Sequence, residues 1–388
     1  MLLDGGTWVG LNAGMRERRP SRAIVDLAAL RANFAEARRA AAGRDVISVI
    51  KADAYGHGSV PVGRALVEAG CGRLAVLTVA EASVLREGGI EVPVLMLSGV
   101  HDAEEAQAAL ELGLTCTVHH AGQVALLRDA AAAVGAEAPV HVEVDTGMRR
   151  MGVPPEDAAA LLQEVVDAPR LSLQGVFTHL ACADDPDLSD SLGQLARFRE
   201  VLAALRARGG EPELVHVANS AGLVAGKPIA EAVPDANAVR PGIMLYGPRP
   251  APHFDVPLRP VMTLETRVVR VRNVRAGESV GYSAEFRAQR DTRVATLALG
   301  YADGVPIAMS GRGSVMIRGE RFPIAGRVSM DYIGVDVGSA SVEIGDAVVV
   351  FGDGKAGRLL VEDAASVAGT ISYELLVRVG ARVPREYV

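Results

Sequence analysis

The sequence predicts an α/β protein in which an N-terminal TIM-type (β/α)8 barrel is followed by a mainly antiparallel, β-rich C-terminal domain. Short β-branched apolar runs alternate with longer helical stretches through the first part of the chain, as in a barrel of parallel strands. Residues 247–260 hold five prolines, and beyond them short alternating runs are separated by glycine turns, which is typical of antiparallel strands. With 388 residues, the chain can bury two hydrophobic cores.

Continuous apolar runs are typical of parallel strands that are covered on both faces. Eight such runs occur: VISVI (46–50), RLAVL (73–77), PVLML (93–97), LTCTV (114–118), PVHVEV (139–144), LQGVF (173–177), LVHVA (214–218) and NAVR (237–240). The stretch between residues 26 and 42 shows the helical pattern, with Leu30 and Phe34 on one face behind Asp26 as a possible N-cap. Eight strand-and-helix units indicate a closed barrel, with a doubly wound open sheet as the alternative.

The proline-rich stretch 247–260 is the expected domain boundary, because proline disfavours both helix and central strand. The interpretation divides the chain into a leader over residues 1–20, a barrel over 21–255 and a β-rich domain over 256–388. Patterned sequence begins only at the end of the leader, so we expect the leader to be disordered.

Charge and composition exclude several classes of partner. The 40 basic and 47 acidic residues give a net charge of −7 without any basic tract, so we expect neither nucleic acid nor an anionic membrane as a partner. Cys71, Cys116 and Cys182 lie far apart, which is typical of a reducing compartment and gives no metal or disulfide spacing. The sequence has neither a signal-peptide pattern nor an apolar run of membrane-spanning length. We therefore expect a cytoplasmic protein that binds a small molecule or another subunit.

Polar residues follow the apolar runs at the positions where a TIM-type barrel places its chemistry. The first run ends in Lys51, one of only three lysines in the chain, and the last ends in Arg240. The other such residues are Asp145, Thr178, His179, Asn219 and Ser220. The last two runs lead into the loops 216–222 and 240–247, where small residues and polar donors suit a phosphate group. The pattern predicts a phosphorylated cofactor bound near a lysine.

Each of these residues also has a purely structural interpretation. His216 is more simply explained as a satisfied core histidine, and Asn219 with Ser220 as the cap of the next helix. Gly242 is also compatible with an ordinary turn. The coincidence of several such residues at one predicted face favours the functional interpretation.

Nine motifs, spread in order over both expected domains, resemble those of the alanine racemases, which depend on pyridoxal 5'-phosphate (PLP). The resemblance runs from about Ser21 to the C-terminus. The motifs are VIKADAYGHG (49–58), DTGMRRMG (145–152), FTHLACAD (177–184), HVANSAG (216–222), RPGIMLYG (240–247), VGYSAEF (280–286), LGYADGVP (299–306), GRVSMDYIGVDV (326–337) and ISYELLVRVGARVPREY (371–387).

The resemblance implies a homodimer in which the C-terminal domain of one subunit completes the active site of the other. It implies that Lys51 holds PLP covalently and that Tyr282 of the partner is the opposing base. It also implies that Arg240 faces the pyridine nitrogen and that His179 holds Arg240 in place. The remaining cofactor-binding residues would be Tyr55, Asn219, Ser220, Gly242, Ile243 and Tyr373, and no metal is implied. Substrate would meet Arg150, Met330, Tyr301 and Asp331.

Two positions depart from the pattern of the family. Position 149 is arginine, so the role of binding the substrate carboxylate is assigned to Arg150 by its spacing from Asp145. Glu143 stands where many relatives carry a lysine that CO2 has carboxylated. Glutamate also supplies a negative charge, but its carboxyl carbon reaches about 3.5 Å less far. We expect Glu143 to replace the modified lysine electrostatically and to orient Arg150.

The expected activity is interconversion of L- and D-alanine for peptidoglycan precursors, with Tyr373, Tyr301 and Met330 leaving room for a small side chain. Racemisation of another small amino acid such as serine is an alternative. A second alternative is a non-catalytic PLP-binding protein, although such a protein would lack the domain that carries Tyr282. A basic-amino-acid decarboxylase would need acidic groups for a distal amine in the second domain and does not explain GRVSMD (326–331). A metal-dependent enzyme would have only His119 and His120, and adjacent residues of a strand point to opposite sides.

Overall fold

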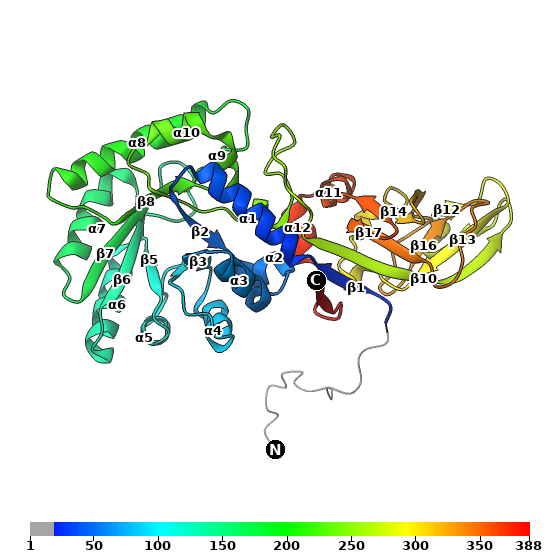
Figure 1. The fold of residues 1–388 in the computed structure, drawn as a ribbon, viewed down its shortest axis with the longest axis horizontal. Coiled ribbons are helices and arrows are strands. Elements are labelled where there is room, and N and C mark those ends of the chain that lie inside the picture. The colour runs from blue at the N-terminus through cyan, green and yellow to red at the C-terminus, as the bar shows by residue number, and fades with distance from the viewer. Residues whose placement is uncertain (1–18) are drawn as a thin grey trace, which may run out of the picture.

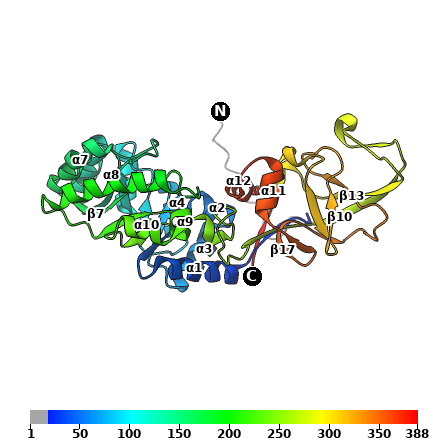
Figure 2. The same cartoon turned by 90° about the horizontal axis from the view of Figure 1, so that it is seen from above.

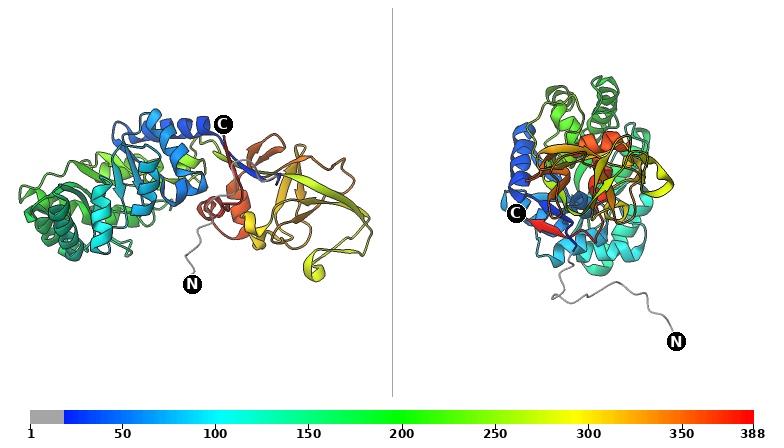
Figure 3. Two further views of the ribbon diagram at one scale, coloured as in Figure 1. Left: turned by 90° about the horizontal axis from the view of Figure 1, so that it is seen from below. Right: turned by 90° about the vertical axis from the view of Figure 1, so that its right-hand side faces the viewer.

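The computed structural model describes residues 19–388, and residues 1–18 of the expected leader lie outside the described part. The chain forms an elongated molecule in which a barrel and a β-sheet domain lie end to end (Figure 1). The view from above shows the same arrangement (Figure 2), and in the end-on view of Figure 3 the sheet domain covers one end of the barrel domain. Both domains share one continuous set of buried apolar side chains.

The barrel confirms all eight predicted strands in their predicted order. They are β2 (Asp45–Val49), β3 (Arg73–Val76), β4 (Val94–Met96), β5 (Thr115–Val118), β6 (Ala138–Glu143), β7 (Leu171–Phe177), β8 (Leu214–Ala218) and β9 (Ala238–Val239). Each strand pairs in parallel with the next, and β9 pairs with β2 to close the ring. The open-sheet alternative is therefore wrong.

Helices cover the outside of the barrel and follow its strands. They are α1 (Leu27–Ala41), α2 (Lys51–Gly56), α3 (Ser59–Glu68), α4 (Val79–Glu87), α5 (Ala103–Glu111), α6 (Ala121–Val134), α7 (Pro155–Asp167), α8 (Ser189–Arg206), α9 (Ser220–Ala225), α10 (Lys227–Ala232) and the 3-10 helix η1 (Ile243–Tyr246). Helix α1 begins at Asp26, whose Oδ1 accepts a hydrogen bond from the backbone N–H of Ala29 at 2.8 Å. Its buried face includes Leu30 and Phe34, as the sequence pattern predicts.

The second domain is mainly antiparallel, as predicted. Its strands are β10 (Met262–Val274), β11 (Ser279–Val280), β12 (Phe286–Arg287), β13 (Thr292–Leu297), β14 (Ser314–Ile317), β15 (Glu320–Pro323), β16 (Ile333–Asp336), β17 (Ala347–Gly354), β18 (Gly357–Leu359) and β19 (Arg385–Tyr387). Short helices complete it: η2 (Tyr282–Ala284), η3 (Tyr301–Asp303), η4 (Ile307–Met309), α11 (Val361–Ala368) and α12 (Ser372–Val377). The long strand β10 pairs with β1, β13 and β17 and forms the centre of the sheet.

The first strand of the chain belongs to this second sheet, which the sequence analysis did not expect. Strand β1 (Arg22–Val25) pairs antiparallel with β10 and parallel with β19, so both ends of the described chain meet in one sheet. A run of four residues does not reveal a partner more than 200 positions away, because pairing depends on the folded chain. Arg19, from the expected disordered leader, also contacts this domain and is part of the fold.

In the part of the chain that the structure describes, no helix has the length and apolar character needed to cross a membrane.

Candidate active site

Lys51 lies at the C-terminal mouth of the barrel, directly after Ile50 and strand β2. The four residues that follow it, Ala52 to Tyr55, have φ values of 52–54° and form one left-handed turn. For residues other than glycine, this conformation costs roughly 1–2 kcal/mol each. A strained turn of this kind persists only where its surroundings hold it, and such turns concentrate at functional sites.

Side chains from neighbouring segments hold this turn. Glu81 Oε1 accepts a hydrogen bond from the Ala52 N–H at 2.7 Å, while its other oxygen accepts from the Leu77 N–H at 2.7 Å. Asp53 Oδ1 accepts from the Ser59 N–H at 2.6 Å. Glu81 thereby ties the loop after β3 to the backbone of Ala52, the residue that follows Lys51.

The surroundings of Lys51 favour its neutral amine. Burial is the main cause that lowers the pKa of Lys51, and the cation of Arg150 lowers it further. The carboxylates of Glu81 and Glu143 act in the opposite direction. A lowered pKa increases the fraction of unprotonated amine at a given pH, and nucleophilic attack on an aldehyde requires that form.

Arg240 is buried at the centre of the same mouth. Its Nη1 donates to His216 Nδ1 at 2.6 Å and to the His216 carbonyl at 3.0 Å. Its Nη2 donates to the Thr178 carbonyl at 2.8 Å and lies 3.4 Å from His179 Nδ1. Four of its five N–H groups are thus used, and Nε–H has no acceptor among residues 19–388. This geometry leaves one directed donor for a bound group.

The bond between Arg240 and His216 defines the protonation of two histidines. Arginine is only a donor, so His216 Nδ1 must be an acceptor and its Nε2 must carry the proton. That Nε2 lies 2.9 Å from His141 Nδ1, which is then an acceptor as well. Burial lowers the pKa of His141 to about 3 and that of His216 well below its ordinary value, and Arg240 adds to both effects. Both side chains are therefore neutral.

This network changes the assignment for holding Arg240. His179 was expected to do so and His216 to be a core histidine, yet the contact of Arg240 with His216 is 2.6 Å and that with His179 is 3.4 Å. Burial, followed by the charge of Arg240, lowers the pKa of His179 to about 3, so it also stays neutral. His216 is fully buried and still contacts a site residue, so its burial did not distinguish core from function.

A small cradle lies where β8, β9 and the turn after Lys51 meet. Ser220 Oγ accepts a hydrogen bond from the Gly242 N–H at 2.9 Å. A Cβ at Gly242 would lie 2.5 Å from Tyr55 Oη, so only glycine fits there. The ring centroids of Tyr55 and Tyr373 are 6.2 Å apart. The structure thus brings together these four of the residues expected around a phosphate.

Two further residues expected at the phosphate have mainly structural contacts. Asn219 caps α9, because its Oδ1 accepts a hydrogen bond from the Gly222 N–H at 3.0 Å. Ile243 is buried at the start of η1. Burial raises the pKa of Tyr373 to about 12 and also raises the pKa of Tyr55, so both phenols remain donors at neutral pH.

Tyr282, Tyr301 and Met330, three of the residues expected from the C-terminal domain, are exposed. Tyr282 is 68 % exposed in a turn where Ser283 and Ala284 have positive φ, at the tip of the hairpin β11–β12. In Figures 1 and 2 this hairpin, coloured yellow, lies at the end of the sheet domain remote from the barrel. Tyr301 and Met330 are 41 % and 51 % exposed. Lys51 and Tyr282 of one chain therefore do not meet.

Two loops that carry Tyr301 and Met330 are joined backbone to backbone. The Tyr301 N–H donates to the Ser329 carbonyl at 2.9 Å, and the Ala302 N–H donates to the Met330 carbonyl at 3.2 Å. A Cβ at Gly300 would lie 2.2 Å from the Ser329 carbonyl oxygen, so the loops approach each other only because position 300 is glycine.

Asp303, which is 1 % exposed, is the ionic centre of these loops. Its carboxylate accepts hydrogen bonds from the Gly300 N–H at 2.8 Å and from Arg382 at 2.7 and 3.1 Å. Arg382 also donates to Asp331 Oδ1 at 2.8 Å. Arg19 adds a second cation at 3.3 Å from Asp303. The expected entrance residue Asp331 is thus held by a charged network that begins at the N-terminal end of the described chain.

We expect Asp303→Asn to lower the free energy of unfolding by about 1.5–3 kcal/mol, because charge-assisted hydrogen bonds to Arg382 are lost. Urea denaturation measures the effect. Asp353→Asn is the matched control, since Asp353 is exposed and lies 4.0 Å from its arginine. Equal unfolding midpoints for the two variants would contradict the role of Asp303.

Glu143, the last residue of β6, lies at the mouth and is 7 % exposed. Its Oε2 lies 3.0 Å from Nε2 of His119, which follows β5. His120 is exposed, so the two adjacent histidines do face different surroundings. Among the described residues, no group of three or more His, Cys, Asp and Glu side chains is arranged to hold a metal.

The sequence analysis missed four residues that hold expected site residues or the segments beside them: Glu81, His119, His216 and Asp303. One signal was available for His119, since it directly follows an apolar run, as Lys51 does. The roles of Glu81 and Asp303 depend on loops that meet only in the fold.

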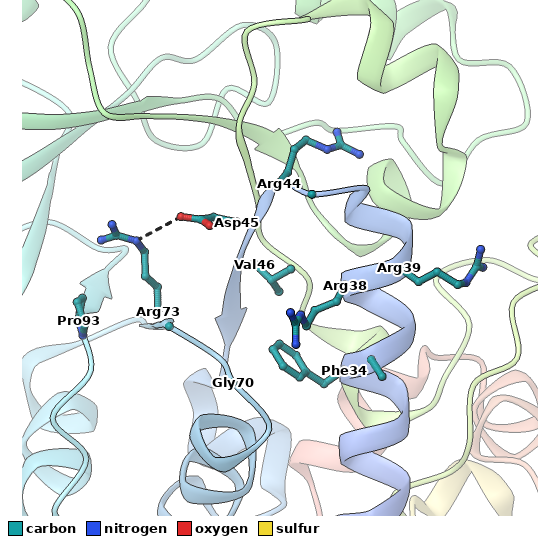
Figure 4. A pocket seen from close by; sticks show the side chains of 12 residues that line it. Phe34, Arg38, Arg39, Arg44, Asp45, Val46, Gly70, Arg73 and Pro93 are labelled. Carbon is teal, nitrogen blue, oxygen red and sulfur yellow. Dashed lines mark ion pairs between the residues drawn. The ribbon is translucent and has the colours of Figure 1, made fainter.

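A wide hollow lies at the opposite end of the barrel and is lined by Arg38, Arg44 and Arg73 (Figure 4). Its volume is about 730 Å³. Asp45 pairs with Arg73, while Arg44 donates to the last carbonyls of α1. Since it opens at the N-terminal ends of β2 and β3, this hollow is not part of the mouth that contains Lys51.

Comparison with known proteins identifies the architecture. The sequence profile of the alanine racemase N-terminal domain matches residues 25–250, and that of the alanine racemase C-terminal domain matches residues 261–387. The chain is 42 % identical over 362 residues to an alanine racemase of Syntrophobacter fumaroxidans, covering 92 % of this chain and 94 % of that protein. It is 41 % identical to an alanine racemase of Thermobifida fusca, covering 94 % and 97 %.

Solved structures agree with the sequence comparison. The crystal structure of alanine racemase from D-cycloserine-producing Streptomyces lavendulae matches with a TM-score of 0.89 and 36 % identity, covering 96 % of this chain and 98 % of that one. The alanine racemase of Bacillus anthracis with bound L-Ala-P matches with a TM-score of 0.87 and 32 % identity, covering 96 % of each chain. Two domain profiles and these full-length likenesses show that the chain belongs to the alanine racemase family.

Proposed function

We propose that two copies of the chain form a PLP-dependent alanine racemase in which each active site combines one barrel mouth with the partner's C-terminal domain. The observation that carries the proposal is the separation of the expected residues. Lys51 and Arg240 lie at the mouth, whereas Tyr282 is exposed in the hairpin β11–β12, at the end of the sheet domain remote from the barrel. A complete site then requires a second copy in a two-fold arrangement.

The residues at the mouth fit the parts of PLP. Gly242, Ser220 and Tyr55 form a cradle in which a side chain at position 242 would collide, which suits a phosphate group close to the backbone. Lys51, with its lowered pKa, supplies the amine that binds the aldehyde. Arg240 has the free Nε–H to face the pyridine nitrogen.

PLP, when bound, supplies the electron-withdrawing ring that acidifies the Cα–H of an amino acid. Arg240 moderates this effect, because a permanent cation at the pyridine nitrogen keeps that nitrogen unprotonated. Burial lowers the pKa of Arg240 to about 10, with Glu143 acting in the opposite direction, so Arg240 is charged at neutral pH. The neutral tautomer of His216 accepts from Arg240 and prevents it from turning away.

Racemisation needs one acid/base group on each face of the planar Cα. We assign Lys51 Nζ to one face and the Oη of Tyr282 from the partner to the other. One takes the proton from Cα while the other delivers a proton from the opposite side, and their roles reverse for the other enantiomer. Arg150 would bind the substrate carboxylate together with the backbone at Met330, while Tyr301 and Asp331 line the entrance.

The exposed apolar residues of the C-terminal domain support the homodimer. Large exposed apolar side chains are removed from water when a second copy covers them, and this burial favours association. Tyr282, Met330, Tyr332 and Ile371 are 68 %, 51 %, 53 % and 61 % exposed. We infer that the partner's barrel covers this face.

Purified protein should absorb visible light through PLP bound to Lys51 and should convert L-alanine to a mixture of enantiomers. Loss of optical rotation measures the reaction. If the protein binds PLP but racemises no amino acid, it is a non-catalytic PLP-binding protein. If it racemises serine faster than alanine, serine is the preferred substrate. Alanine is preferred because Tyr373, Tyr301 and Met330 crowd the position of its methyl group. We also propose a cytoplasmic role in supplying D-alanine for peptidoglycan.

Arg150→Gln should move PLP uptake by the apoenzyme to higher pH. Arg150 lowers the pKa of Lys51, so its removal raises that pKa and less neutral amine is present at a given pH. Borohydride trapping of PLP on Lys51 across a pH series measures the midpoint. Arg149→Gln is the control, and a shift of equal size in both variants would contradict the assignment of Arg150.

A further inference from the structure

Glu143 is a buried carboxylate at a mouth that also contains Lys51 and Arg240. Burying an ionised carboxylate is costly unless hydrogen bonds or cations compensate it. The Glu143 side chain makes one hydrogen bond within residues 19–388, in which its Oε2 accepts from His119 Nε2 at 3.0 Å. Its charge acts on Lys51 and on Arg240 and raises the pKa of both. His119 is therefore its one direct partner in the described chain.

The register of the barrel places these two side chains side by side. Strands β5 and β6 are parallel neighbours, with Val118 opposite Val142, so His119 and Glu143 are the next pair along the ladder. Gln123 fixes the backbone of His119, because its Oε1 accepts from the His119 N–H at 2.8 Å. Gln123 is itself buried and donates to the Val100 carbonyl. These hydrogen bonds of Gln123 hold the backbone of His119, whose Nε2 contacts Glu143.

The hydrogen-bonding roles of the two groups indicate which nitrogen of His119 carries the proton. A carboxylate only accepts, so His119 Nε2 carries the proton. Nδ1 of His119 is buried and has no partner, and a proton there would be an unsatisfied buried donor. The tautomer with the proton on Nε2 leaves no buried donor of His119 unsatisfied, and it directs that N–H at Glu143.

We propose that His119 is a positioning residue that holds Glu143 as an unmodified anion at the barrel mouth, toward which Arg150 is oriented. The inference rests on the proposed function, because it gives Arg150 the substrate carboxylate to bind. Arg150 is exposed and makes no hydrogen bond or ion pair within the described residues, and Glu143 Oε1 is likewise unused. A held carboxylate with one free oxygen can orient an arginine that is otherwise unrestrained.

The first test compares two replacements of His119. His119→Leu removes the donor, whereas the side-chain amide of His119→Gln places an N–H near the position of Nε2. We expect His119→Leu to raise the KM for L-alanine about 10-fold, with PLP absorbance retained, and His119→Gln to stay within about threefold of the parent. Glu143→Gln should raise the KM for L-alanine by a similar factor. The double variant His119→Leu/Glu143→Gln should have a KM no higher than that of Glu143→Gln alone. His120→Leu, at the exposed neighbour, is the matched control.

The second test does not depend on alanine. If His119 holds Glu143 near Lys51, then His119→Leu should move the pH midpoint of PLP uptake downward, as Glu143→Gln does, and His119→Gln should not. Protein that shows this pattern but racemises no amino acid would overturn the proposed function and leave the inference standing. An unchanged KM and midpoint in His119→Leu would overturn the inference. So would a loss of folding in both His119 variants, since His119 would then be structural.

Discussion

Lys51→Ala is expected to reduce racemase activity by at least about 10⁴-fold and to abolish covalent PLP binding in the same step. The substitution removes both the amine that holds the cofactor and one of the two bases, and a positioned base alone contributes about 10²–10⁴-fold. Initial rates of L-alanine racemisation with excess PLP measure the loss, and borohydride trapping measures covalent binding. No other lysine lies at the mouth: the two others are Lys227, in α10, and Lys355, in the turn between β17 and β18.

Lys227→Ala is the matched control for this loss. Lys227 is a surface lysine whose side chain is 82 % exposed and pairs with Glu231 at 3.3 Å. A surface ion pair of this kind contributes little, so this variant should match the parent in rate and PLP content. Activity that survives in Lys51→Ala, or falls equally in Lys227→Ala, would show that the base lies elsewhere.

Tyr282→Phe is expected to lower turnover by about 10²–10⁴-fold, because it removes the hydroxyl that exchanges a proton at Cα and keeps the ring. PLP content and dimerisation should not change, since the phosphate cradle and Lys51 are untouched. Tyr332→Phe is the control, because Tyr332 is also exposed and lies in the same domain. Equal turnover in Tyr282→Phe and the parent would remove Tyr282 from the mechanism.

Mixing these two inactive variants tests whether the site is shared. In a hybrid dimer of Lys51→Ala with Tyr282→Phe, one site carries both substitutions and the other carries neither. If subunits exchange at random, about half of the dimers are hybrids with one intact site, so activity should recover to about a quarter of the parent. A site built within one chain would give no recovery. The structure favours recovery, because α2, which begins with Lys51, lies at the junction of the two domains, whereas the hairpin β11–β12 that carries Tyr282 lies at the far side of the sheet domain (Figure 1).

The barrel could be predicted because its strands are locally encoded. Apolar runs of four to six residues bounded by helical patterns identify parallel strands, and eight such runs indicate a closed barrel. The rule that chemistry follows the ends of the strands located Lys51 and Arg240. Strand β1 was not predicted. Its four residues have no short loop to the strand with which they pair, so the local sequence does not reveal that partner in the second sheet.

The contacts that hold the site residues could not be predicted in this way. His216 was interpreted as a core histidine, and it is buried, yet its Nδ1 lies 2.6 Å from Arg240. Burial and function coincide here because an arginine taken out of water needs buried acceptors for its N–H groups, and His216 supplies two of them to Arg240. Glu81 reaches the turn after Lys51 only because β2 and β3 are neighbours in the barrel.

The sequence by itself determined the order of the barrel strands, the position of Lys51 after the first of them, and the presence of a glutamate at position 143. These features are periodic or are single residues at defined spacings. Only the tertiary structure decided that Glu143 meets His119, that His216 holds Arg240, and that Tyr282 lies too far away to serve its own barrel. These contacts and distances depend on strand register and on the arrangement of the two domains. Both join residues that are far apart in the sequence, so they exist only in the folded chain.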